Sequence, residues 1–387
     1  MENIAGKKII FLVPIFGGGG GEKVVSDLTM HLPESVQKII VAFENKNYYP
    51  YNGKFISMDI PLSTNFFSKV LIFLKGYIKF KNILRKEKPD YVMSFGSLQN
   101  ILNIVSTKKS IVRVDNPILV THAGFMEKAY PWLVGMLFNR AAKIMVVSEG
   151  LKKELVEKFN IVESKISVVY NAVDVGKIRE LAGQPLEPKY QEIFNHPIVI
   201  NIGTLIGQKG QSHLIKAFVQ LKKEVKDAQL IILGEGPLEG QLKKLVKELN
   251  LENGVHFLGW QKNPFKFLAR SKVFALPSLW EGFGIVILEA MALQVPVVAF
   301  DCNFGPREIL APELDPAWII KDIEYAKNGV LLPLPGRPGH QGMLTKALVD
   351  ALTNKVLRLS TIGSALERVK DFNLENFLQN YKFLWDK

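Results

Sequence analysis

Two glutamates, Glu281 and Glu289, stand eight positions apart around a glycine-rich segment. Gly282-Phe283-Gly284 leads into apolar residues that predict a helix. The free N–H groups and the dipole at such a helix start favour an anion such as a diphosphate. A carboxylate at the start of the helix and another two turns further along would hold hydroxyls, one of a sugar and one of a ribose. The spacing therefore predicts a nucleotide-sugar site and a sugar transferase.

Lys209 is a second candidate, in the loop after the predicted strand 198–202. Loops at this end of parallel strands face the ligand crevice of α/β proteins, here a cleft between two domains. An ammonium there would neutralise a departing diphosphate, although a solvated lysine is the ordinary alternative. The sequence thus predicts Lys209 and Glu281 as catalytic residues.

A run of five glycines, Gly17–Gly21, separates a predicted strand from a predicted helix. Backbone amides of Gly18, Gly19 and Gly20 would approach an acceptor or the donor phosphates. A dinucleotide fingerprint is the alternative, with Glu44 as its acidic ribose ligand. Glu22 and Lys23 break the required glycine spacing, so the fingerprint is disfavoured; a merely flexible turn remains open.

Residues 65–88 mix large apolar side chains with seven Lys and Arg. Such a composition on a helix favours the surface of an anionic membrane. The alternative is a helix that packs one face on a sheet and leaves its lysines in water. The formal net charge of +12 is uneven, at +9 through residue 185 and +3 beyond it. We therefore expect an anionic partner, a lipid surface or a diphosphate-linked acceptor, at the first half.

Short apolar runs alternate with amphipathic ones, which predicts parallel sheets covered by helices on both faces. A stretch rich in Pro, Gly and charge, 173–197, predicts a linker. The expected domains are 1–180 for the acceptor and 190–370 for the nucleotide-sugar, with a terminal helix over 371–387. The expected strands are 8–15, 38–43, 91–95, 110–114 and 143–147, then 198–202, 228–233, 254–257, 273–276 and 295–300.

Composition excludes several classes of protein. The single cysteine, Cys302, excludes an internal disulfide and a cysteine zinc site, and it fits a reducing compartment. No apolar run approaches the roughly 20 residues of a membrane-spanning helix, and no clear signal peptide is found. We expect a cytoplasmic protein, peripheral on the cytoplasmic face of the membrane. No metal-ligand spacing and no nucleic-acid recognition module is found, so neither a metal cofactor nor nucleic acid is expected.

Several segments together resemble the retaining glycosyltransferases of family 4, which have the GT-B fold. The Glu281–Glu289 spacing matches their E-x7-E motif. The other ordered matches are 201–211 with Gly203 and Thr204, 233–237 with Gly234, 255–260 with Trp260, 301–310 and 328–333. The resemblance implies two facing Rossmann-like domains and a C-terminal helix that crosses back to the first domain.

The resemblance also implies roles. Glu281 would approach the donor sugar, Glu289 the ribose, and the backbone of Phe283, Gly284 and Ile285 the phosphates. Transfer would retain the anomeric configuration by front-face attack. The segment 301–310 is similar to bacterial enzymes that add hexoses or N-acetylhexosamines to lipid-linked surface glycans.

Two positions depart from the family pattern. Thr204 stands where the family has an arginine, which removes one cation from the expected diphosphate clamp; Arg307 is a possible substitute. The family often has a histidine after the strand ending near Val114, where this chain has Asp115. His122 and Asp115 are therefore both candidates for contact with the donor sugar.

We expect a hexose or N-acetylhexosamine to be moved from a UDP-linked donor to a glycan or polyprenyl-diphosphate acceptor. Two alternatives stay open. A nucleotide-sugar epimerase of similar fold would need carboxylates placed for acid–base work. A nucleotide-binding membrane scaffold without catalysis would fit the missing arginine and histidine.

Overall fold

The computed structural model describes residues 6–16, 20–61, 66–121, 125–302, 304–315, 318–336 and 339–381. The chain forms two compact units, one of Met1–Asn171 with Glu375–Lys387 and one of Ala172–Leu374. The first change of unit thus lies at 171/172, before the expected linker. That stretch instead contains two helices of the second unit, α7 (Val175–Ala182) and α8 (Pro188–Gln191).

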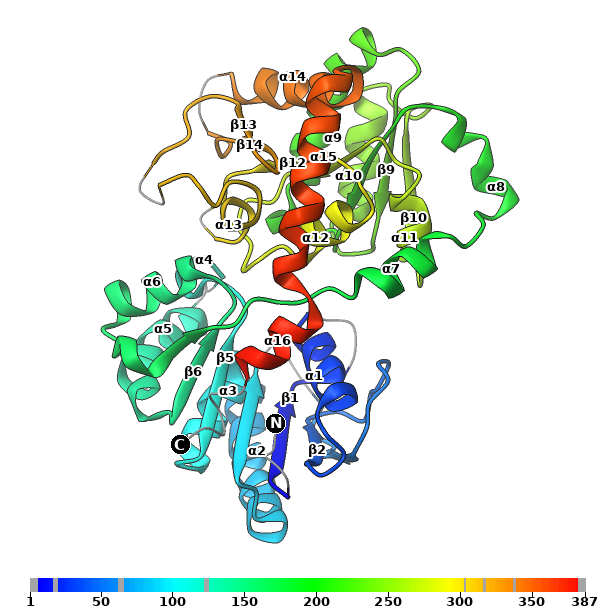
Figure 1. Ribbon diagram of the computed structural model, residues 1–387. Coiled ribbons are helices and arrows are strands. Elements are labelled where there is room, and N and C mark those ends of the chain that lie inside the picture. Colours follow the sequence, from blue (N-terminus) through cyan, green and yellow to red (C-terminus); the bar gives the residue numbers. More distant parts are fainter. Residues whose placement is uncertain are drawn as a thin grey trace. The chain divides into compact units, whose positions relative to one another are not determined.

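The first unit is built on a seven-stranded sheet in the order β3-β2-β1-β4-β5-β6-β7, parallel throughout (Figure 1). Its strands are β1 (Lys8–Val13), β2 (Gln37–Ala42), β3 (Lys54–Ser57), β4 (Tyr91–Phe95), β5 (Ser110–Val114), β6 (Lys143–Val146) and β7 (Ile166–Val168). Its helices are α1 (Gly20–His31), α2 (Phe66–Glu87), α3 (Ser97–Ser106), α4 (Ile118–Thr121), α5 (Phe125–Leu137), α6 (Glu149–Phe159) and α16 (Leu374–Asn380).

The central strands of this sheet are continuous apolar runs because helices cover them. Ile10 and Val41 of β1 and β2 pack with Phe80 of α2 and Leu102 of α3 in one buried cluster. The predicted strands of this half are confirmed to within two residues at each end. The short strands β3 and β7 were not predicted, since runs of four and three residues carry little periodicity.

The second unit has its own seven-stranded sheet, in the order β10-β9-β8-β11-β12-β14-β13. All neighbours are parallel except β13 and β14. The strands are β8 (Ile198–Ile202), β9 (Gln229–Leu233), β10 (Val255–Gly259), β11 (Val273–Leu276), β12 (Val297–Phe300), β13 (Glu324–Ala326) and β14 (Gly329–Leu332). The remaining helices are α9 (Gln211–Glu224), α10 (Glu239–Glu248), α11 (Phe265–Leu268), α12 (Ile285–Ala292), α13 (Pro306–Leu310), α14 (His340–Thr353) and α15 (Lys355–Val369).

One face of this sheet is covered by α9, α10 and α14. Phe218 of α9 and Leu348 of α14 are fully buried against strand residues such as Ile232. The Thr345 hydroxyl donates a hydrogen bond to the Ala217 carbonyl oxygen at 3.1 Å and ties α14 to α9. These contacts hold the strand ends, from which the functional loops leave, in one rigid frame.

Both sheets begin at an inner strand, β1 or β8, and add strands first on one side and then on the other. The strand order therefore reverses between β1 and β4 in the first unit and between β8 and β11 in the second. In open parallel sheets, ligands bind outside the carboxyl ends of the strands at this reversal. Each unit thus has one place where a ligand is expected.

Candidate active site

In the second unit, the reversal between β8 and β11 brings Lys209 and Glu281 together. Lys209 ends the short 3-10 helix η5 (Gly207–Lys209) in the loop after β8, and Glu281 follows β11. The Lys209 Nζ lies 2.6 Å from the Glu281 Oε1. The Glu281 side chain is 7% exposed and that of Lys209 is 21% exposed, so the pair is shielded but reachable from solvent.

A serine that the sequence analysis missed holds the glutamate. The Ser278 hydroxyl donates a hydrogen bond to the same Glu281 Oε1 at 2.7 Å, and Ser278 is fully buried. The loops are also joined directly, because the Gln208 side-chain amide donates to the Trp280 carbonyl oxygen at 2.9 Å. Glu281 is therefore fixed by a cation and a hydroxyl before any ligand is present.

Glycines let these loops approach one another. Gly210 has φ +62°, and a Cβ on it would come within 1.9 Å of the Pro277 carbonyl oxygen. Gly234, after β9, has φ +133°, and a Cβ there would lie 2.1 Å from the Gly203 carbonyl oxygen. Side chains at either position would push the backbones of neighbouring strand ends apart. Gly203 and Gly234, both predicted ligand contacts, thus lie side by side at the sheet edge.

The E-x7-E segment has the local structure that its sequence predicts. Gly284, with φ +84°, caps α12, which starts at Ile285. Phe283 is buried and its ring meets that of Phe372 edge-on at 5.5 Å. This packing holds the residue before the Gly284 cap in place at the start of α12. Glu289 is half-buried one turn further along the helix.

The structure also shows the surroundings of Thr204 and Arg307, the two residues considered for the expected diphosphate clamp. Thr204 is exposed, and its carbonyl oxygen accepts from the Gln211 amide at 3.2 Å. The Arg307 guanidinium pairs with Asp301 and donates to the carbonyl oxygens of Asp315 and Trp318. These bonds hold the Arg307 guanidinium against neighbouring residues of the chain. They do not support the suggestion that Arg307 replaces the arginine missing from the diphosphate clamp.

Trp260, another predicted contact, is 66% exposed, and its backbone N–H donates to Glu235. Cys302 lies in this region and is buried. Burial, with the nearby negative charges of Glu281 and Asp301, raises the pKa of its thiol well above the usual range. A raised pKa disfavours the thiolate form that a nucleophilic cysteine needs.

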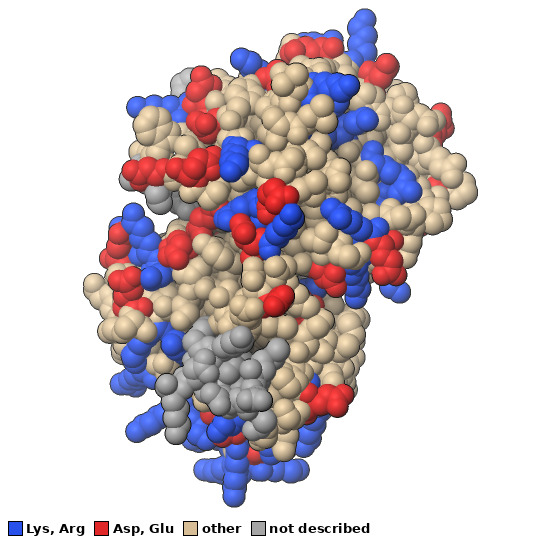
Figure 2. Space-filling model, in the orientation of Figure 1, with Lys and Arg blue, Asp and Glu red and all other residues tan. Residues whose placement is uncertain are grey.

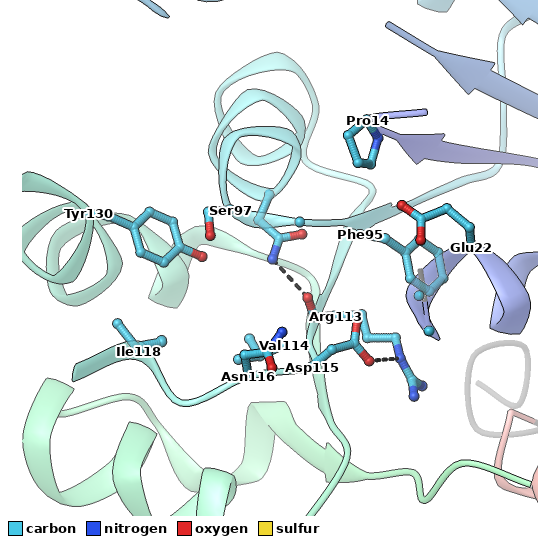
Figure 3. Close-up of a pocket in the computed structure, with 14 residues that line it drawn as sticks. Pro14, Glu22, Phe95, Ser97, Arg113, Val114, Asp115, Asn116, Ile118 and Tyr130 are labelled. Carbon is cyan, nitrogen blue, oxygen red and sulfur yellow. Dashed lines mark hydrogen bonds and ion pairs between the residues drawn. The ribbon is translucent and has the colours of Figure 1, made fainter. Parts of the chain in front are cut away.

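The first unit has a pocket of about 360 Å³ at its own strand reversal (Figure 3). Pro14 after β1, Phe95 and Gly96 after β4, and Asp115 after β5 line it, together with Gly20 at the start of α1. The predicted contacts Gly20 and Asp115 are thus brought together. Gly18, Gly19 and His122 lie outside the described residues.

A second carboxylate, that of Glu22, also lines this pocket. In the sequence, Glu22 was considered only because it breaks the glycine spacing of a dinucleotide fingerprint. Glu22, in the first turn of α1, is 9% exposed. Burial, and to a lesser degree the charge of Asp115, raises the pKa of Glu22, partly offset by a hydrogen bond from its own backbone N–H. Two acidic groups therefore share one pocket.

Asp115 is held by a buried arginine. Arg113 is completely buried, and its Nε donates to Asp115 Oδ1 at 2.7 Å. Its Nη1 donates to the Tyr381 hydroxyl at 2.9 Å and its Nη2 to Asn171 Oδ1 at 2.5 Å. Asn171 and Tyr381 belong to the two segments by which the chain leaves and re-enters this unit. No sequence pattern pointed to this cluster, because its members are far apart along the chain.

Two family models match the chain. The model described as glycosyl transferases group 1 matches residues 186–327, and the model described as glycosyltransferase family 4 matches residues 18–177. The first covers the Lys209–Glu281 region and the second covers the pocket of Glu22 and Asp115. Both units are therefore accounted for by glycosyltransferase domains.

Curated relatives agree. An uncharacterised glycosyltransferase of Methanocaldococcus jannaschii is 36% identical over 337 residues, covering 80% of this chain and 82% of that protein. The N-acetylgalactosamine-N,N'-diacetylbacillosaminyl-diphospho-undecaprenol 4-alpha-N-acetylgalactosaminyltransferase of Campylobacter jejuni is 28% identical over 332 residues, covering 79% and 84%.

Solved structures share the fold. The crystal structure of HepE from Anabaena in complex with UDP and glucose superposes with a TM-score of 0.75 at 19% identity, covering 97% of this chain and 98% of that one. At this identity the likeness bears on the fold alone, and it confirms the GT-B architecture expected for two Rossmann-like units. With the family models and the archaeal relative, it shows that the chain belongs to the glycosyltransferases, with a family 4 N-terminal domain and a group 1 C-terminal domain.

Proposed function

We propose that this glycosyltransferase is a retaining enzyme that moves a hexose or N-acetylhexosamine from a UDP-sugar to a lipid-diphosphate-linked or glycan acceptor in the synthesis of a surface polysaccharide or glycoprotein. The observation that carries the proposal is the Lys209–Glu281 pair at the strand reversal, next to the start of α12. A cation and helix N–H groups suit a diphosphate, and a buried carboxylate beside them suits the hydroxyls of a sugar.

The relatives support the substrate classes. The Campylobacter relative is named for an undecaprenol-diphosphate-linked acceptor, and the Anabaena structure holds UDP and glucose. We assign the donor to the second unit, with Glu281 at the sugar, Lys209 and the backbone of 283–285 at the diphosphate, and Glu289 at the ribose. We assign the acceptor to the pocket of the first unit.

In the proposed reaction, the bond between the sugar C1 and the diphosphate oxygen breaks while the acceptor oxygen bonds to C1 from the same face. The acceptor proton passes to the departing diphosphate, so no protein base is required. The salt bridge from Lys209 and the hydrogen bond from Ser278 support a positioning role for Glu281 rather than a nucleophilic one. Lys209 would contribute by stabilising the charge that develops on the leaving group.

We propose that the diphosphate clamp works without a metal ion. Lys209 and the N-terminus of α12 supply positive charge at the place where a divalent cation would otherwise be needed. Among the described residues, no group of three His, Cys, Asp or Glu side chains is arranged to hold a metal ion. Activity in excess EDTA tests this proposal; a loss reversed by Mg²⁺ or Mn²⁺ contradicts it.

We further propose that α2 rests on an anionic membrane on the cytoplasmic side. Its inner face packs on the sheet through Ile72 and Phe80, as both interpretations of 65–88 require. Its outer face is not simply polar, since Leu71, Leu74 and Ile78 are 57%, 52% and 62% exposed. A helix that met only water would place charged residues at these positions.

Charge around α2 favours a lipid surface as the occupant of this apolar face. Lys75, Arg85 and Lys86 are exposed on the same helix, and Lys and Arg side chains gather at the lower end of the view where α2 lies (Figure 2). Lys79 and Lys81 are engaged instead, through hydrogen bonds to the carbonyl oxygens of Met58 and Ser106. In the described part of the chain, no helix is long and apolar enough to cross a bilayer.

The decisive experiment for the function is a donor screen followed by turnover. Thermal shift with UDP-, GDP- and ADP-sugars should select a UDP-sugar, and NMR of the product of an undecaprenyl-diphosphate-linked sugar should show the retained anomer. An inverted anomer would refute the retaining assignment. Conversion of the donor to its epimer without any acceptor would favour the epimerase alternative.

A further inference from the structure

The pocket of the first unit carries acidic groups where a lipid-linked acceptor would place either a sugar or a phosphate. We propose that Glu22 and Asp115 are specificity-determining residues that admit an uncharged sugar, whose hydroxyl or acetamido groups donate hydrogen bonds to them, and reject a phosphate at this place. The inference rests on the proposed function, because it assigns the acceptor to this pocket.

Glu22 is the main observation. The residue is 9% exposed, and its carboxyl group points into the pocket from the first turn of α1 (Figure 3). Among the described residues, the hydrogen-bond partner of this carboxyl group is its own backbone N–H. A buried carboxyl group with spare acceptor capacity is costly unless a ligand supplies donors. Hydroxyl and amide N–H groups of a sugar are such donors.

Asp115 supplies a second acceptor in the same pocket. One of its oxygens is taken by Arg113, and the other lies 3.4 Å from where a Cβ of Gly21 would be, beside the start of α1. The charge of Asp115 contributes to the raised pKa of Glu22, so the two carboxyl groups are close enough to interact. A donor-rich ligand between them would relieve this repulsion, whereas a phosphate would increase it.

The positively charged side chain in the pocket lining, that of Arg113, is already bound to other groups of the protein. Arg113 is the one Lys or Arg among the described lining residues, and each of its three guanidinium nitrogens donates to a protein oxygen. The N-terminus of α1 would ordinarily attract an anion, but Glu22 already supplies a negative charge in its first turn. Nothing in the described lining is therefore left to neutralise a phosphate.

The remaining lining suits a sugar ring. Asn100 accepts from Ser94 and donates to the Arg113 carbonyl oxygen, so this amide is occupied in the framework. Pro14, Phe95 and Ile118 supply apolar surface against which the C–H groups of a pyranose can pack. The volume of about 360 Å³ lies in the range of small-ligand sites.

The test compares neutral and phosphorylated probes on the intact protein. Methyl glycosides of glucose, galactose, N-acetylglucosamine and N-acetylgalactosamine, each with its 6-phosphate ester, are measured for binding by saturation-transfer NMR and for transfer with the UDP-sugar. We expect a neutral glycoside to bind, and its 6-phosphate to bind at least tenfold more weakly. Glu22→Gln should reduce this preference at least tenfold while donor affinity is unchanged. Asp115→Asn should reduce the preference in the same direction.

The matched control is Glu34→Gln, an exposed glutamate beyond the far end of α1, which should leave the preference intact. Stronger binding of the phosphate esters, no binding of any neutral glycoside, or an unchanged preference in Glu22→Gln would overturn the inference. A failure of the proposed function would give a different result from a failure of this inference. Neutral glycosides would still bind in a Glu22-dependent way, but no sugar would be transferred to them or to lipid-linked acceptors.

Discussion

The Lys209 ammonium lies 2.6 Å from the Glu281 carboxylate, although the two residues are 72 positions apart in the chain. They meet because the loops after β8 and β11 leave adjacent strands at the carboxyl edge of the sheet. In this arrangement the charges of the two groups neutralise each other. A nucleotide-sugar that bound here would break this ion pair. Its diphosphate would bind the lysine, and its sugar hydroxyls would bind the glutamate.

Removal of the lysine should affect chemistry more than binding. Lys209→Ala should lower kcat by on the order of 10² or more, with a smaller change in donor affinity, because the charge it stabilises develops as the diphosphate departs. Steady-state kinetics with the UDP-sugar measures this. Lys216→Ala, an exposed lysine on α9, is the control and should behave like the native protein. Native turnover in Lys209→Ala would refute the clamp.

Removal of the Glu289 carboxylate should weaken binding of the donor and leave the fold intact. Glu289→Ala should weaken UDP binding by roughly 1.5–3 kcal/mol, the range for charge-assisted hydrogen bonds to ribose hydroxyls. Calorimetry with UDP measures the loss, and circular dichroism checks that the fold survives. Glu248→Ala, an exposed glutamate on α10, serves as control. Unchanged UDP affinity would remove the ribose role.

Membrane binding should depend on both kinds of side chain on α2. A charge-reversed variant should no longer pellet with anionic liposomes, and 1 M salt should weaken binding of the native protein, since surface attraction is screened within about 10 Å at 0.1 M. A second variant that makes the outer apolar face polar should also fail to pellet. The charge-reversed variant carries Lys75→Glu, Arg85→Glu and Lys86→Glu, and the polar variant carries Leu71→Ser, Leu74→Ser and Ile78→Ser.

The control for membrane binding reverses three exposed lysines of the second unit, Lys226, Lys244 and Lys247. It matches the change in net charge of the α2 variant but should still pellet. Turnover on a water-soluble acceptor should be the same in all variants, while turnover on acceptor embedded in liposomes should fall only for the α2 variants. Normal pelleting of both α2 variants would mean that α2 is a packed helix with a solvated outer face.

The raised pKa of Glu22 predicts a pH-dependent stability. The folded protein keeps a proton on Glu22 at pH values where the unfolded chain, with a carboxyl pKa near 4.5, has released it. This contribution is fully present below the unfolded pKa and is lost as pH rises through the folded one. Glu22→Gln should therefore have a higher Tm than the native protein at pH 8 and no advantage at pH 4. Equal Tm differences at the two pH values would contradict this.

Tyr381 should contribute to the stability of the first unit through its hydroxyl. Tyr381→Phe keeps the ring, which meets Phe377 at 4.9 Å, but leaves a buried Arg113 N–H without its partner. We expect a loss of about 1–3 kcal/mol, seen as a lower Tm. Tyr325→Phe is the comparison. It removes a hydroxyl that donates to Asp350, but the Tyr325 side chain is exposed, so the loss of stability should be smaller. A smaller loss in Tyr381→Phe than in Tyr325→Phe would argue against the role of Arg113.

The sequence by itself predicted the parallel α/β architecture and the catalytic residues Lys209 and Glu281, although not their ion pair. Both follow from local patterns, since apolar runs predict buried strands, and loops after neighbouring parallel strands meet at one edge. It also predicted the helix start at Gly284, because a glycine before an apolar run allows the left-handed cap that the structure has.

Only the tertiary structure decided which distant side chains meet. Arg113 and Tyr381 are 268 positions apart, and no periodicity relates them. In the sequence Glu22 only broke a glycine spacing, whereas the fold places it in one pocket with Asp115. The outer face of α2 is the same kind of case. The sequence shows a mixture of apolar and basic residues, but only packing against the sheet reveals which of them the core buries and which, like Leu74 and Ile78, remain in solvent.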